Sequence, residues 1–233
     1  MIELRQKAIN IILRGVVMEI KDFENKIINA DCLDILKQLP DKCIDLVLTD
    51  PPYGIGIDGQ KQCECKNPKH NRKEHQRKEW DSAIPPKEIF DEMKRVSKNM
   101  IVWGANYFNE YLEQGHKGWI VWDKGQDGLT MSDCELAYST FDNPTRIFRM
   151  NRVELLKDGT IHPTQKPLRL FKRCVAEYSK EGDLIADFFS GSGTTAIACH
   201  NLKRRFICVE KDFDYWKASC KRLEEHQKQL TLF

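Results

Sequence analysis

Short apolar runs alternate with amphipathic segments along most of the chain. The runs are four to six residues long and rich in Val, Ile and aromatic residues, which is typical of buried strands. They lie at residues 45–49, 100–103, 118–122, 184–189 and 206–209. Apolar residues at helical spacing lie between them, at Ile89, Phe90, Met93 and Val96, and at Leu170, Phe171, Cys174, Val175 and Tyr178 after Pro167. This alternation predicts an α/β fold with a mostly parallel, twisted sheet and helices on both faces.

Two polar stretches interrupt the alternation. Residues 54–80 contain few apolar residues and seven Lys or Arg, so we expect a long mobile loop there. Residues 124–161 are rich in turn formers, and their segments ELAYSTF and RIFRM alternate in a way that predicts one or two short strands. This second stretch is too short for an independent domain, so we expect residues 1–233 to form a single domain.

The composition is typical of a folded, soluble chain. Hydrophobic residues make up 41% and charged residues 31%, which excludes wholesale disorder. The net charge is only +2, so contact with a polyanion would need a local basic patch. We expect the nine cysteines to be reduced and mostly buried in a cytoplasmic protein. Near the N-terminus, Arg14, Glu19 and Lys21 interrupt the apolar residues, which indicates an amphipathic segment and not a membrane span.

The tetrad Asp50-Pro51-Pro52-Tyr53 directly follows the strand predicted at residues 45–49. Ligands of open α/β sheets bind at the carboxyl ends of strands. Proline has no amide donor, so the tetrad offers bare carbonyl acceptors beside the flat face of a tyrosine. This combination suits a planar heterocycle with an exocyclic amino group, whose hydrogens Asp50 and the Pro51 carbonyl would accept. The alternative is a simple turn with a capping Asp and rigid prolines.

A second motif, Ser190-Gly191-Ser192-Gly193-Thr194-Thr195, follows the strand predicted at 184–189 and precedes a helix expected to start near Thr194. Its glycines would let a ligand approach the backbone at a helix N-terminus. Glu210, at the end of the next run, is placed to accept hydrogen bonds from ribose hydroxyls. The third glycine of the dinucleotide fingerprint is missing and no Lys follows, which disfavours a nicotinamide dehydrogenase or a phosphate-binding loop. The motif suits a nucleoside cofactor without a pyrophosphate.

Together with the segment HPTQKP at residues 162–167, these motifs resemble the S-adenosylmethionine-dependent DNA amino-methyltransferases. Their order resembles the permuted group, in which the catalytic motif precedes the cofactor motif, and the resemblance runs from about Lys26 to Leu223. It implies a Rossmann-like methyltransferase domain and a role in restriction-modification. The implied reaction transfers a methyl group from S-adenosylmethionine to N6 of adenine in double-stranded DNA, releases S-adenosylhomocysteine and requires no metal. N4 methylation of cytosine is the runner-up, and an inactive nucleic-acid-binding relative is the third alternative.

The resemblance also assigns roles to individual residues. It implies catalytic roles for Asp50, Pro51, Pro52 and Tyr53, with Tyr53 stacking on a base flipped out of the duplex. The implied cofactor-binding residues are Asp31, Asp50, Lys166, Asp187, Phe189, Ser190, Gly191, Gly193, Thr194 and Glu210. For Asp31, a helix N-cap is an equally good interpretation.

The basic stretch after Tyr53 is predicted to contact DNA phosphates, although a solvated charged loop is the alternative. The predicted contacts are Lys61, Lys66, Lys69, Arg72, Lys73, Arg77 and Lys78. Cys63, Cys65, His70 and His75 in this stretch suggest zinc, but the tight spacing lacks a second cysteine pair, so we expect no metal there. Residues 124–161 are a short candidate target-recognition region, and a homodimer would offer a second source of specificity.

Overall fold

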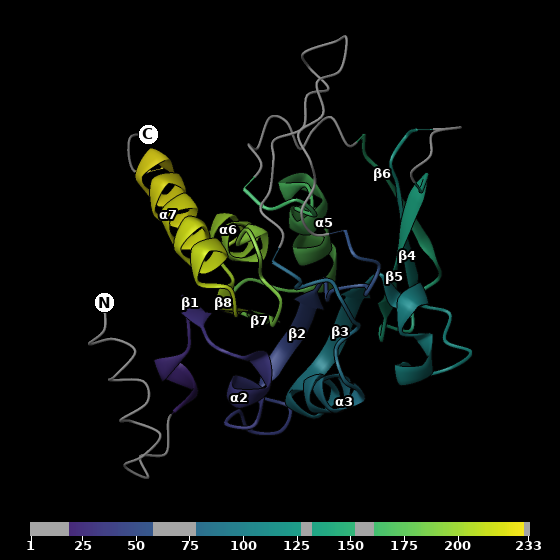
Figure 1. The fold of residues 1–233 in the computed structure, drawn as a ribbon, viewed down its shortest axis with the longest axis horizontal. Helices are drawn as coiled ribbons and strands as arrows, with labels where there is room; N and C mark the ends of the chain where they lie inside the picture. The colour runs from purple at the N-terminus through teal and green to yellow at the C-terminus, as the bar shows by residue number, and fades with distance from the viewer. Residues whose placement is uncertain (1–18, 58–77, 127–131, 152–160, 231–233) are drawn as a thin grey trace.

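The structure, a computed structural model, describes residues 19–57, 78–126, 132–151 and 161–230. Eight strands of these residues form one sheet in the order β1-β8-β7-β2-β3-β5-β4-β6 (Figure 1). Their bounds are β1 Lys26–Asn29, β2 Ile44–Thr49, β3 Ser97–Trp103, β4 Trp119–Asp123, β5 Cys134–Ser139, β6 Arg146–Arg149, β7 Leu184–Asp187 and β8 Arg205–Glu210. The strands from β1 to β3 in this order are parallel, and β5 is antiparallel to both β3 and β4. The predicted α/β class with a mostly parallel sheet is confirmed.

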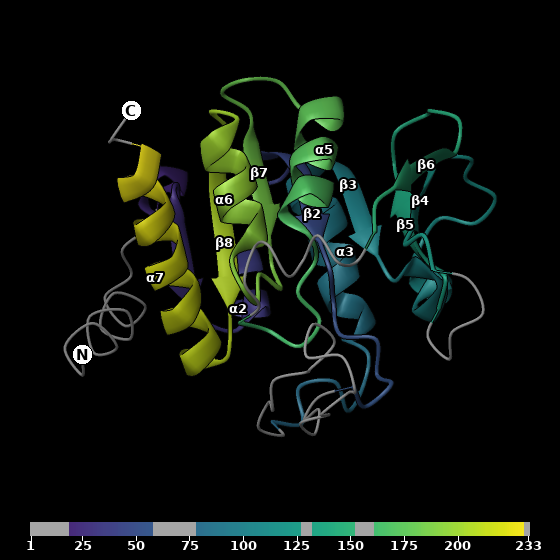
Figure 2. The same ribbon diagram turned by 90° about the horizontal axis from the view of Figure 1, so that it is seen from above.

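Helices cover both faces of the sheet (Figure 2). Helices α2 (Cys32–Leu36) and α3 (Lys87–Val96) pack on one face, and α5 (Leu168–Tyr178), α6 (Thr194–Asn201) and α7 (Phe213–Leu230) pack on the other. The 3-10 helices are η1 (Ile20–Asp22), η3 (Ala105–Tyr107) and η4 (Asn109–Tyr111). The apolar faces predicted for α3 and α5 are confirmed, because they pack against the sheet.

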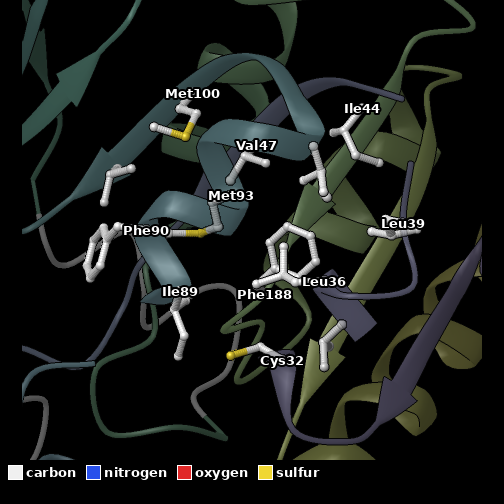
Figure 3. Packing of buried hydrophobic residues seen from close by; sticks show 14 of the residues in the cluster. Cys32, Leu36, Leu39, Ile44, Val47, Ile89, Phe90, Met93, Met100 and Phe188 are labelled. Atoms are coloured by element: carbon white, nitrogen blue, oxygen red, sulfur yellow. The ribbon is translucent and has the colours of Figure 1, made fainter. Parts of the chain in front are cut away.

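Strand β2 shows why its sequence is almost continuously apolar. Val47 packs in the cluster beneath α2 and α3, together with Phe90 and Met93 (Figure 3). Its neighbours Leu46 and Leu48 point to the opposite cluster, beneath α5 and α6. Side chains alternate between the two faces of a strand, so a strand covered on both faces needs apolar residues at successive positions.

The order of the strands creates a crevice between β2 and β7. The chain passes from β2 to β3 on one side and from β7 to β8 on the other, while β2 and β7 pair in parallel with Leu46 opposite Ile185. Such a reversal separates the loops that follow the two strands and leaves space at their carboxyl ends. The Asp50 tetrad and the glycine turn, which follow these two strands, therefore meet at one edge of the sheet.

Some details differ from the sequence predictions. Strand β7 ends at Asp187, so Phe189 belongs to the following turn, where its amide donates a 3.1 Å hydrogen bond to the Asp187 carboxylate. Pro167, which the sequence places near the first turn of the second predicted helix, is the N-cap of α5. The sequence analysis assigned neither β1 nor α7, which are joined by a 2.8 Å hydrogen bond from the Trp216 indole to the Ile27 carbonyl.

Seven cysteines lie within the described residues; all are free, and four of them are buried. This agrees with the expected reduced thiols. In the same part of the chain, no helix combines the length and the apolar character that crossing a membrane would require. The predicted amphipathic N-terminal segment lies mostly outside the described residues.

Candidate functional site

A cavity of about 870 Å³ opens at the carboxyl ends of β2, β7 and β8. Three segments that follow these strands line it: the tetrad at 50–53, the turn at 187–192 and residues 210–213. His162, Gln165 and Lys166 of the HPTQKP segment also line it, as do residues from 30–33 and from 78–89. The structure thus brings together the three motifs that the sequence analysis selected.

Asp50 is held by two side chains at the wall of this cavity. The Tyr53 hydroxyl donates a 2.6 Å hydrogen bond to Oδ1, and the Lys166 ammonium lies 2.5 Å from Oδ2. Lys166 also donates to the Tyr53 hydroxyl at 3.0 Å. Lys166 is only 6% exposed, so its charge depends on protein groups for compensation. A short network therefore joins the tetrad to the HPTQKP lysine.

Two residues that the sequence analysis missed extend the network. Glu135 of β5 pairs with Lys166 at 3.0 Å through Oε2 and with Lys124, just beyond β4, at 2.8 Å through Oε1. The Tyr53 hydroxyl lies 3.4 Å from the same Oε2. Two ammonium groups thus face two carboxylates in a largely buried cluster. One sequence signal could have found Glu135: it lies two residues before the buried Ala137 and therefore on the same side of the strand.

The electrostatics of the network follow from its burial. Burial raises the pKa of Asp50 above its ordinary value, and the positive charge of Lys166 opposes this only in part. Burial also disfavours a charged Lys166, but Asp50 and Glu135 outweigh it and raise the pKa of Lys166. For Glu135, Lys166 and Lys124 overcome burial and lower the pKa to about 2. Lys166 and Glu135 are therefore charged at neutral pH.

The ring of Tyr53 is held by aromatic neighbours and by a glycine. It stacks on Tyr107 of η3 with ring centroids 4.8 Å apart and an angle of 13° between the planes, and it contacts Phe108 in a tilted arrangement. Gly104 has φ +68°, and a Cβ atom there would lie 2.0 Å from the Tyr53 ring. Only glycine fits this position, because it tolerates the left-handed backbone and leaves room for the ring.

The glycine turn contains both structural and cavity-lining residues. The buried carboxylate of Asp187 accepts hydrogen bonds from the hydroxyls of Thr49 and Thr195, and burial raises its pKa to about 6. Gly193 is the left-handed N-cap of α6 and is not among the cavity-lining residues; a Cβ atom there would meet Ser219 at 3.0 Å. Asp187, Phe189, Ser190, Gly191 and Thr194 do line the cavity.

Ser190 has a feature that points to a ligand. Its side chain is buried in the cavity wall, and its hydroxyl has no hydrogen-bond partner among the described residues. An unsatisfied buried hydroxyl costs free energy unless a ligand or water pairs with it. The cavity wall therefore offers a free polar group next to the N-terminus of α6.

Two further carboxylates, Glu210 and Asp31, line the cavity. Glu210 accepts hydrogen bonds from the amides of Gly191 and Asp212, both at 2.8 Å, yet burial dominates and raises its pKa to about 7. Asp31 caps α2 through the Leu33 amide and pairs with Lys211 at 2.9 Å. Burial opposes the ionisation of Asp31, but the Lys211 hydrogen bond and the capped amide lower its pKa. Asp31 is thus a helix N-cap that also lines the cavity.

The rim of the cavity includes Lys78, which the sequence analysis placed in the DNA-binding set. Its ammonium pairs with Asp212 and Asp214, both at 2.7 Å, and lies over the ring of Tyr215. The remaining predicted DNA contacts lie outside the described residues: Lys61, Lys66, Lys69, Arg72, Lys73 and Arg77. The possible zinc ligands Cys63, Cys65, His70 and His75 lie there too. Within the described ranges, no cluster of three or more metal-ligating side chains occurs.

The segment that follows Tyr53 begins as an ordered turn. Buried Asp81 accepts hydrogen bonds from the amides of Gly54 at 2.8 Å and Ile57 at 2.9 Å, and its carbonyl accepts from Gly56. The Asp81 side chain therefore fixes the backbone that leaves the tetrad. Ile55, at the tip of this turn, is 49% exposed.

Comparison with known proteins decides the family. Residues 44–221 match the family described as DNA methylase (N6_N4_Mtase), which covers most of the chain. The chain belongs to this DNA methylase family. Its membership confirms the resemblance to the S-adenosylmethionine-dependent DNA amino-methyltransferases, and it identifies DNA as the substrate.

Individual relatives and structures agree with this assignment. The chain is 29% identical to the type II methyltransferase M2.DpnII of Streptococcus pneumoniae, over 90% of this chain and 95% of the relative. It is 28% identical to the type II methyltransferase M.HinfI of Haemophilus influenzae, over 88% of this chain and 70% of the relative.

The structure of an M1.HpyAVI–SAM complex superposes with a TM-score of 0.59 at 22% identity, covering 85% of this chain and 99% of that one. The cytosine-N4-specific PvuII DNA methyltransferase gives a TM-score of 0.58 at 16% identity, covering 87% and 90%. The expected Rossmann-like methyltransferase fold is thus confirmed.

Proposed function

We propose that this DNA methyltransferase transfers the methyl group of S-adenosylmethionine to N6 of adenine in double-stranded DNA. One observation carries the proposal: the Asp50 tetrad and the glycine turn line the same cavity. Family membership supports the DNA substrate. The aspartate that opens the tetrad favours adenine, because the tetrad of N4-cytosine enzymes more often opens with serine.

The residues of the cavity fit the cofactor. The free Ser190 hydroxyl and the N-terminus of α6 suit the polar methionine end. Glu210 would accept hydrogen bonds from the ribose hydroxyls, and Asp31 lies at the side where we place the adenine. Phe189, Gly191 and Thr194 would lie close to the cofactor. Asp187 also lines the cavity and holds the turn through the Phe189 amide, while Gly193 would support the turn from behind.

The tetrad would hold the target amine. Asp50 and the Pro51 carbonyl would accept the two amino hydrogens, which draws the nitrogen away from conjugation with its ring. Tyr53 stacks on the base after the base leaves the duplex, which costs a few kcal/mol of stacking and pairing. When bound, S-adenosylmethionine supplies an electrophilic methyl group. The amine nitrogen forms a bond to this methyl group, and the electron pair of the broken carbon–sulfur bond stays on sulfur. Asp50 then holds the proton that the nitrogen sheds and passes it to water.

Alignment and preorganised acceptors would provide most of the rate enhancement, because the methyl group is already activated. No metal takes part in this proposal.

DNA contacts would come from the basic residues from Lys61 to Lys78, which follow the tetrad in the sequence. Residues 124–161 would contribute to target recognition, and a homodimer would place a second such region on the duplex. A DNA substrate and free cysteines favour a cytoplasmic location.

The test is to incubate the purified protein with methyl-labelled S-adenosylmethionine and genomic DNA, and then to separate the nucleosides. We expect label in N6-methyldeoxyadenosine, at a defined sequence when modified bases are mapped by sequencing. Label in N4-methyldeoxycytidine would establish the runner-up. Cofactor binding without transfer to either base would instead indicate an inactive nucleic-acid-binding relative.

A further inference from the structure

The resting arrangement of Asp50 is poorly suited to the role proposed for it. Each carboxylate oxygen already accepts a hydrogen bond, one from Tyr53 and one from the Lys166 ammonium. A carboxylate neutralised by an adjacent ammonium attracts a developing positive charge only weakly. The attacking amine nitrogen gains positive charge during methyl transfer, so Lys166 should loosen its contact with Asp50 as the base binds.

Glu135 is the carboxylate with which Lys166 can pair when it leaves Asp50. Its Oε2 atom already lies 3.0 Å from the Lys166 ammonium and 3.4 Å from the Tyr53 hydroxyl. Both groups that hold Asp50 therefore lie beside a second acceptor. A small movement of Lys166 toward Glu135 would free Asp50 without leaving a buried ammonium unpaired, which would be costly.

The two oxygens of Glu135 have separate partners. Lys124, itself buried, pairs with Oε1 at 2.8 Å, while Oε2 faces Lys166 and Tyr53. The backbone of Glu135 is held in β5, between β3 and β4. The Lys124 contact thus holds the Glu135 carboxylate, and the sheet holds the Glu135 backbone. Atom Oε2 therefore stays directed at Lys166 and the Tyr53 hydroxyl.

We propose that Glu135 is a positioning residue for methyl transfer, which takes over Lys166 and the Tyr53 hydroxyl when Asp50 turns to the target amine. This inference rests on the proposed function and adds a residue to it. Glu135 does not touch the base; it acts through Lys166 and Tyr53. Its removal should therefore slow the transfer step and spare cofactor binding.

The test compares Glu135→Gln with the wild-type chain in single-turnover reactions at saturating DNA and S-adenosylmethionine. The substitution keeps the size of the side chain and removes its charge. We expect the transfer rate to fall between about 10- and about 100-fold, as a displaced reactive group would cause. The dissociation constant for S-adenosylmethionine should change by less than about threefold, because the transfer step alone is affected.

A double variant separates this role from simple charge balance. Glu135→Gln leaves Lys124 without its carboxylate, and Lys124→Met removes that unpaired charge. If Glu135 only neutralises Lys124, the double variant recovers the wild-type rate. If Glu135 receives Lys166, the double variant stays as slow as Glu135→Gln. The matched control is Glu181→Gln, which removes an exposed carboxylate paired with Lys203 and should leave the rate unchanged.

Three results would overturn the inference: an unchanged rate in Glu135→Gln, a parallel loss of melting temperature and cofactor binding, or recovery in the double variant. The proposed function fails in a distinguishable way, because the wild-type chain itself would then transfer no methyl group to DNA.

Discussion

The Thr49 hydroxyl donates a 2.7 Å hydrogen bond to the Asp187 carboxylate. Thr49 is the last residue of β2 and Asp187 the last of β7, so the bond joins the strands immediately before the tetrad and the glycine turn. The remaining contacts of Asp187, from the Thr195 hydroxyl and the Phe189 amide, also lie within the fold. The two walls of the cavity are therefore fixed to each other at the edge of the sheet.

Asp50, by contrast, is held by side chains that can exchange partners, and its replacement tests its chemical role. We expect Asp50→Asn to lower the transfer rate by about 100- to about 1000-fold, because it removes a charged acceptor from the reacting amine. The melting temperature and the affinity for S-adenosylmethionine should stay near wild-type values. Single-turnover rates and equilibrium binding measure both effects. Equal losses of rate, binding and melting temperature would mean that the carboxylate is mainly structural.

Gly104→Ala tests the placement of Tyr53. The added Cβ atom would lie 2.0 Å from the Tyr53 ring, so the ring must move. We expect the transfer rate to fall by about 100-fold, because a misplaced stacking surface misaligns the base. Gly115→Ala is the matched control, since Gly115 has φ +74° and no atom within 4 Å of an added Cβ. Both variants pay about 1 kcal/mol for the left-handed backbone, but only the first should lose activity. Similar activity in the two variants would contradict this role for Gly104.

Glu210 makes the affinity for the cofactor depend on pH. Burial raises its pKa to about 7, so most molecules carry a protonated Glu210 at pH 6 and an ionised one at pH 8. The ionised form accepts hydrogen bonds from ribose hydroxyls more strongly. We expect the ratio of wild-type to Glu210→Gln affinity for S-adenosylmethionine to rise by about tenfold from pH 6 to pH 8. Calorimetric titration measures this ratio; a constant ratio would exclude ionised Glu210 from the binding site.

The basic residues that follow the tetrad in the sequence are tested through the salt dependence of DNA binding. We expect Arg72→Glu combined with Lys73→Glu to weaken binding and to reduce the slope of log K against log salt concentration by about 2. Lys94→Glu with Lys98→Glu is the control. These exposed lysines lie in the last turn of α3 and at the start of β3, at the end of the parallel strands away from the cavity. A wild-type slope in the first variant would remove the segment from the DNA interface.

Local sequence patterns predicted the three motifs that meet at the cavity. The tetrad and Glu210 were located correctly because each follows an apolar run that forms a buried strand, and strand ends mark ligand sites in such sheets. Glu135 and Lys124 were missed because their role depends on β5 inserting between β3 and β4, an order that alternation alone does not encode. The roles of Asp187 and Gly193 depend on partners far along the chain, Thr49 and Ser219, which no local pattern reveals.

The account rests on one cavity holding the methyl donor against the target amine. Mapping the methylated sequence provides a duplex for co-crystallisation with S-adenosylhomocysteine, and the structure of that complex is the most direct measurement. We predict the cofactor sulfur beside Ser190 and Glu210 and the adenine N6 atom at Asp50, with space between them for an in-line methyl group whose carbon would lie about 3 to 3.5 Å from N6. A cofactor bound outside this cavity, or a target base that remains stacked in the duplex away from Tyr53, would contradict the account.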